Sequence, residues 1–80
     1  MGKSLSSTEG ETLAALLRAV RSSAGLTQAE VAERLKQPQS FVSKYESGER
    51  RLDLVELRQI CKALGISLGE FVRRFEKEAS

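Results

Sequence analysis

Signals that begin and end helices are the strongest constraint on how this chain can fold. Thr27, Asp53 and Ser67 each suit a helix N-terminus, and each is followed three residues later by a glutamate that can complete a capping box. Gly25 and Gly65 suit the position just past a helix C-terminus. Apolar residues recur at helical spacing between these signals, and no segment alternates as a strand would. The sequence therefore predicts an all-α fold.

Five helices are predicted from these signals. Thr8 and Glu11 are expected to open the first helix as a capping box. Pro38 is expected to open the third, because a proline fits the first helical position, where no donor is needed. Leu54 is assigned to the apolar stripe of the fourth. The expected spans are 9–24, 28–35, 38 up to Gly48, 54–64 and 68–77.

Length and composition favour one small folded unit. The chain has 80 residues, 40% of them hydrophobic, which is typical of a single globular domain. We expect a disordered tail over 1–7 and one domain over 8–78. No apolar run approaches the ~20 residues of a membrane span, and no secretory signal peptide is visible.

The residue types exclude several kinds of chemistry. With no histidine and one cysteine, the chain cannot form an internal disulfide or a Ser-His or Cys-His catalytic pair, and a zinc site is not expected. Cys61 falls on the apolar face of a predicted helix, so we interpret it as a core thiol. We therefore predict no enzymatic activity, no metal and no cofactor. The net charge of +2 permits nucleic-acid binding without requiring it.

One predicted helix has a polar face suited to DNA. Gln39, Ser40, Ser43 and Lys44 fall on one side of the helix that begins near Pro38. Glutamine can bond bidentately to adenine, lysine to guanine O6 and N7, and serine to several base edges. A short helix with this outer face fits a DNA major groove.

Four segments in this order resemble the helix-turn-helix family of Cro proteins and phage repressors, also called the xenobiotic-response-element (XRE) family. They are LRAVRSSAGL, TQAEVAERL, SFVSKYESGER and LRQICKALGIS, within residues 13–66. The resemblance implies a five-helix, lambda-repressor-like domain with a helix-turn-helix motif over 27–46, in which the third helix enters the major groove. It implies base contacts from four residues, Gln39, Ser40, Ser43 and Lys44.

The resemblance also implies roles for residues outside the recognition helix. Gln28 matches a position that bonds a DNA phosphate, and Arg21 and Glu46 match positions that form a buried or half-buried ion pair. The family usually has glycine where Lys36 stands, because that residue takes a positive φ, and a lysine there would cost about 1 kcal/mol.

The loop after the third helix offers further contacts to DNA. Arg50 and Arg51 are interpreted as phosphate ligands, with solvated loop charges as the alternative. Phe41 lies beside the residues expected to read bases. Its ring would either contact a thymine methyl or pack back against the second helix, and the sequence does not decide between these.

The predicted function is sequence-specific binding of double-stranded DNA by a dimeric, stand-alone repressor. One small module offers few base contacts, so a homodimer on two half-sites is expected, with Val72 and Phe75 at its interface and Phe71 in the core. The expected location is the cytoplasm, on nucleoid or phage DNA, with no membrane or metal partner. The alternative is a protein-interaction module or an antitoxin-type protein with the same fold.

Overall fold

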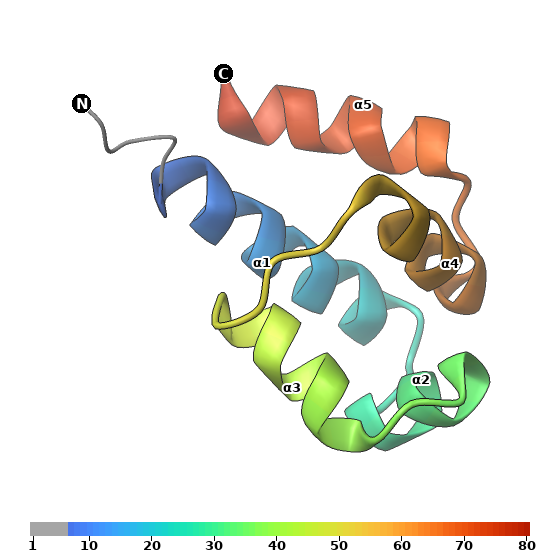
Figure 1. The fold of residues 1–80 in the computed structure, drawn as a ribbon. Helices are drawn as coiled ribbons and strands as arrows, with labels where there is room; N and C mark the ends of the chain where they lie inside the picture. The colour runs from blue at the N-terminus through green and yellow to red at the C-terminus, as the bar shows by residue number, and fades with distance from the viewer. Residues whose placement is uncertain (1–6) are drawn as a thin grey trace.

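The computed structural model describes residues 7–80, so the tail expected over 1–7 lies outside the described part except for Ser7. Five helices account for most of this part, and it contains no strand. They are α1 (Ser7–Ser23), α2 (Gln28–Leu35), α3 (Gln39–Ser47), α4 (Leu54–Leu64) and α5 (Leu68–Ala79). Figure 1 shows α1 through the middle, with α2 and α3 below it and α4 and α5 above. The prediction of a five-helix, all-α fold is confirmed.

Two helix starts differ from the prediction. Thr8 lies inside α1, where its carbonyl accepts a hydrogen bond from Thr12 Oγ1 at 3.0 Å, so it does not cap the helix as expected. Pro38 has φ −66° and ψ 153°, which places it just outside α3 as the N-cap residue. The helix therefore begins at Gln39, because an extended ψ is incompatible with a helical residue.

The other caps are formed by local side chains. Thr27 and Asp53 each make both halves of the predicted capping box. Ser67 accepts from the Glu70 amide at 3.1 Å, but the Glu70 carboxylate does not return to the cap. It bonds instead to two arginines three and four residues further along α5. The predicted box at Ser67 is therefore only half formed, because charged partners on the helix compete for the glutamate.

The turn between α2 and α3 depends on a left-handed residue. Lys36 has φ 57° and ψ 44°, and its amide donates to the carbonyls of Ala32 and Glu33. The Gln37 amide closes the turn on Ala32 O at 3.0 Å. The positive φ expected at this position is confirmed, and a lysine pays about 1 kcal/mol there relative to glycine.

The core joins all five helices. α3 packs against α1 and α2, α4 packs against α2 and α5, and α5 also packs against α1. Cys61 and Phe71 are buried as predicted. Leu54 is 67% exposed, so its assignment to the buried stripe of α4 is wrong: nothing in the described chain covers that side of the first turn. The buried core residues are Leu17, Val20, Val31, Ala32, Val42, Tyr45, Ile60, Cys61, Leu64 and Phe71.

Candidate nucleic-acid interface

The outer face of α3 is polar and open to solvent. Its four candidate base-contacting residues are all exposed: Gln39, Ser40, Ser43 and Lys44. The opposite face is anchored in the core by Val42, Tyr45 and Glu46, each no more than 3% exposed. The helix therefore has the two-sided character that entry into a major groove requires.

A buried ion pair anchors the C-terminal end of α3. Arg21 donates from Nε to Glu46 Oε2 at 2.7 Å and from Nη2 to Oε1 at 3.0 Å, and its Nη1 donates to Leu26 O at 2.8 Å. The two side chains are 14% and 3% exposed. The hydrogen bond that Arg21 donates to Glu46 is the main cause that raises the pKa of Arg21 above its ordinary value. The pair joins the end of α1 to the end of α3 and fixes the angle between them.

The Glu46 carboxylate is also connected, through Gln28, to the exposed face of α3. Gln28 Nε2 donates to Glu46 Oε1 at 3.0 Å, and Gln28 Oε1 accepts from Gln39 Nε2 at 3.3 Å. Gln28 is half-buried. Its amide keeps one N–H free, and Gln39 keeps one N–H and its oxygen, so Gln39 retains both groups that a bidentate contact to adenine needs. A chain of hydrogen bonds thus orients Gln39 from the core outward.

Arg18 also contacts this end of α3, although the sequence analysis did not single it out. Its Nη1 donates to the Glu46 carbonyl at 3.2 Å, which satisfies one of the unpaired carbonyls at the helix C-terminus. The available signal was spacing, because Arg18 precedes Arg21 by three residues and so shares its face of α1.

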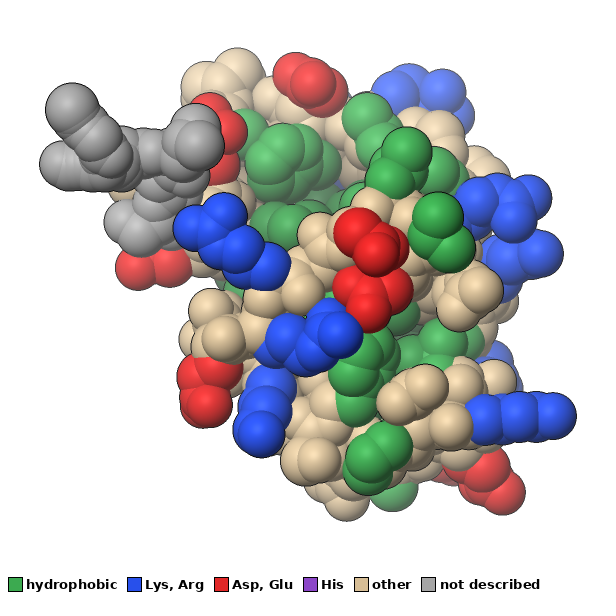
Figure 2. All heavy atoms as spheres, in the orientation of Figure 1, with side chains coloured by type: hydrophobic (Ala, Val, Ile, Leu, Met, Phe, Trp, Pro, Cys, Tyr) green, Lys and Arg blue, Asp and Glu red, His purple; other side chains and the backbone are tan. Residues whose placement is uncertain are grey.

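The loop after α3 carries two arginines in different surroundings. Arg50 is held by Glu56, by the Arg51 carbonyl and by the ring of Phe41, whereas the Arg51 side chain has no ion-pair or hydrogen-bond partner within residues 7–80. Figure 2 shows Lys and Arg side chains gathered over α3 and this loop, with acidic side chains beside them. Arg50 and Arg51, which were given the same role from the sequence, therefore differ in their contacts within the protein.

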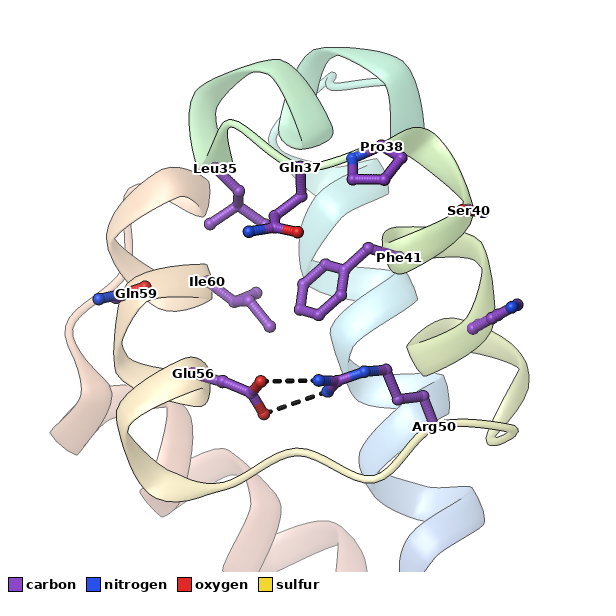
Figure 3. Close-up of a pocket in the computed structure, with 10 residues that line it drawn as sticks. Leu35, Gln37, Pro38, Ser40, Phe41, Arg50, Glu56, Gln59 and Ile60 are labelled. Carbon is purple, nitrogen blue, oxygen red and sulfur yellow. Dashed lines mark hydrogen bonds and ion pairs between the residues drawn. The ribbon is translucent and has the colours of Figure 1, made fainter.

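The Phe41 ring is half-buried and packs against residues of α3 and the following loop. Its ring meets the Tyr45 ring edge-on, with centroids 5.4 Å apart, and the Arg50 guanidinium lies 4.7 Å from the Phe41 centroid. The ring points into a groove of about 480 Å³ between α3 and α4, facing Ile60 (Figure 3). It is half-buried and covered by a cation, and the exposed large hydrophobic side chains of the described residues lie on other helices than α3.

Exposed apolar side chains lie on α4 and α5. Leu54 and Val55 are 67% and 66% exposed, and Val72 is 39% exposed. Phe75 is half-buried. Helical periodicity does not reveal where the covering helices stop, so it placed Leu54 in the buried stripe and did not single out Val55.

Across residues 7–80, no three His, Cys, Asp or Glu side chains are grouped so as to hold a metal ion. None of the helices formed by these residues combines the length and the apolar character that crossing a membrane requires.

The fold and the exposed face of α3 define a helix-turn-helix domain, and the comparisons give its family. The helix-turn-helix family model HTH_3 matches residues 17–71, so the chain belongs to the XRE-type helix-turn-helix family of DNA-binding regulators. No curated protein matches the chain.

Several solved structures are similar to it over most of its length. An XRE-family like protein from Pseudomonas syringae pv. tomato str. DC3000 is 41% identical, with a TM-score of 0.83 over 91% of this chain and 89% of that one. The restriction-modification controller protein C.Esp1396I, as a tetramer with its natural 35-base-pair operator, is 25% identical, with a TM-score of 0.84 over 90% and 95%. The clp gene regulator ClgR from C. glutamicum is 28% identical, with a TM-score of 0.80 over 90% and 92%.

Proposed function

We propose that this protein is a dimeric repressor that binds a specific sequence of double-stranded DNA through α3. The observation that carries the proposal is a solvent-exposed polar face on α3, oriented from the core by the Arg21–Glu46 ion pair. The similar controller protein in complex with its operator supports duplex DNA as the ligand. As a regulator of bacterial or phage DNA, the protein would act in the cytoplasm.

The proposed base contacts come from the exposed face of α3. Gln39 would bond adenine and Lys44 guanine, because their side chains are long and carry the matching donors and acceptors. Ser40 and Ser43 would contact neighbouring base edges. Gln28 would give its free N–H to a phosphate near the N-terminus of α2, where the helix dipole adds partial positive charge.

The loop is proposed to contact the phosphate backbone through Arg51. Its side chain is exposed and has no intramolecular partner within the described residues. The phosphate contact expected from Arg50 competes with its contacts to Glu56 and Phe41.

A homodimer is proposed because one module offers few contacts for tight, specific binding. Val72 and Phe75 on α5 remain the proposed interface, supported by the exposure of Val72. The exposed pair Leu54 and Val55 is a second apolar surface that a partner subunit can cover. A Val72→Glu variant that sediments as a monomer, when the wild-type protein sediments as a dimer, would support this interface.

The test is selection of binding sites from a pool of random duplexes, followed by a salt titration of the recovered site. A palindrome with half-sites about one helical turn apart and a steep salt slope is expected. Lys44→Ala should weaken binding by about 5- to 150-fold and relax the preference at one base position. Lys62→Ala, which removes an exposed lysine from α4, is the matched control. No enrichment at low salt would refute the proposal.

A further inference from the structure

The Arg50 guanidinium joins three parts of the molecule at one point. Its Nη1 and Nη2 bond to Glu56 Oε1 and Oε2 at 3.2 and 2.9 Å, and Nη1 also bonds to the Arg51 carbonyl at 2.9 Å. Its carbon lies 4.7 Å from the centroid of the Phe41 ring. Figure 3 shows this arginine reaching from the loop across the groove to α4. Three of the five guanidinium N–H groups are thus used within the protein.

The Glu56 carboxylate serves a second partner as well as Arg50. Its Oε1 accepts the Asp53 amide at 3.0 Å, while the Asp53 carboxylate accepts the Glu56 amide at 2.7 Å. The side chain that receives Arg50 is therefore already fixed by the N-terminal cap of α4. A side chain held by two independent contacts is a firmer anchor for the loop than a freely rotating glutamate.

Phe41 connects the anchored Arg50 side chain to α3. It lies on α3 between the candidate base-reading residues Ser40 and Ser43. Its ring packs edge-on against Tyr45, which is only 3% exposed, and the Arg50 guanidinium lies over the same ring. The start of α4, the loop and the middle of α3 are therefore connected through one arginine.

We propose that Phe41, Arg50 and Glu56 form a positioning clamp that fixes the α3–α4 loop against the recognition helix. Arg50 acts on DNA binding through this clamp, and the phosphate contact in the loop belongs to Arg51. The inference rests on the proposed function of DNA binding and deepens it, because it separates a positioning arginine from a contacting one.

The competing assignment makes Arg50 a phosphate ligand that Glu56 holds until DNA arrives. The two assignments predict opposite effects of one substitution on the affinity for DNA. Glu56→Gln keeps an oxygen for the cap, since glutamine also serves in a capping box, but removes the charge that holds Arg50. If Arg50 were a phosphate ligand, this change would free a cation and remove a nearby anion, so binding would tighten. If the clamp positions the loop, binding weakens.

The experiment compares the wild-type chain with Glu56→Gln, Arg50→Gln and Arg51→Gln on the operator recovered by site selection. Affinity is measured at several salt concentrations, below the melting temperature of every variant. Glu56→Gln and Arg50→Gln should each weaken binding by about 1.4- to 5-fold, the range of coupling in exposed ion pairs, and the double variant should be no weaker than either single one. Arg51→Gln should reduce the salt slope by about 1, and Arg50→Gln should leave it unchanged.

A second measurement tests the clamp without DNA. Amide hydrogen exchange over residues 48–53 should be faster in Glu56→Gln and Arg50→Gln than in the wild-type chain and in Arg51→Gln, the matched control. The inference is overturned if Glu56→Gln binds as tightly as wild type or tighter, if Arg50→Gln lowers the salt slope, or if exchange in the loop is unchanged. A wild-type chain that selects no DNA sequence refutes the proposed function instead, and the exchange result then decides the clamp alone.

Discussion

Replacing Arg21 with alanine removes the main partner of a buried carboxylate. Glu46 is 3% exposed and accepts two hydrogen bonds from Arg21 and one from Gln28. The substitution leaves only the Gln28 amide as a side-chain donor to that carboxylate. It also strips the Leu26 carbonyl of its bond from Arg21. The variant therefore leaves a buried charge almost uncompensated. The resulting loss of folding free energy is far larger than the net contribution of the intact pair.

The cost can be bounded from the geometry. Breaking a buried ion pair by removing one partner costs about 3–5 kcal/mol. The lower end applies here, because the Arg21 side chain is 14% exposed and Gln28 remains in place. In a domain of this size each kcal/mol shifts the melting temperature by about 4–8 °C, so a loss of about 3 kcal/mol lowers it by about 12–24 °C.

Thermal unfolding followed by circular dichroism, together with DNA affinity below both melting temperatures, measures the effect. Affinity should fall with stability, because the same carboxylate orients Gln28 and, through it, Gln39. Arg18→Ala is the matched control: it removes an arginine from the same helix that reaches only the Glu46 carbonyl, so its cost should be about 1 kcal/mol. A variant of Arg21 with reduced affinity and unchanged melting would refute the structural role.

Three further results are expected. Lys36→Gly should raise stability by about 1 kcal/mol in a denaturant titration, since φ is 57° there; a loss of stability would contradict this. Burial raises the pKa of the Cys61 thiol to about 11, so it should resist a thiol reagent at pH 8 in the folded protein and react after unfolding. The Arg50 hydrogen bond lowers the pKa of Glu56, so the clamp should hold above about pH 4.5 and be lost as pH falls through the folded value. In a carboxyl NMR titration Glu56 should titrate at lower pH than in Arg50→Gln.

The helices and most of their ends were predictable because their signals are local, although the starts predicted at Thr8 and Pro38 were wrong. The boxes at Thr27 and Asp53 involve residues three apart, and the burial of Cys61 and Phe71 follows from helical spacing. The local prediction failed at Ser67, where neighbouring arginines on α5 compete for the capping glutamate. Sequence spacing shows which side chains can bond to each other within one helical turn, but not which of these hydrogen bonds forms.

The candidate site was predictable only in part, for a related reason. The outward placement of Lys44 follows from the periodicity of α3, and the Arg21–Glu46 contact follows from a family resemblance rather than from the residues alone. The partner of Arg50 had no signal of its own, because a loop arginine six residues from a glutamate has many conformations open to it.

The sequence by itself determined the five helices and which side of α3 faces water, since each depends on residues within a few positions of one another. Only the tertiary structure decided that Leu54 is left uncovered and that Arg50 turns toward Glu56 and Phe41. Those outcomes depend on where separate helices stop and on which of several charged partners lies in reach, and distances across the fold fix both.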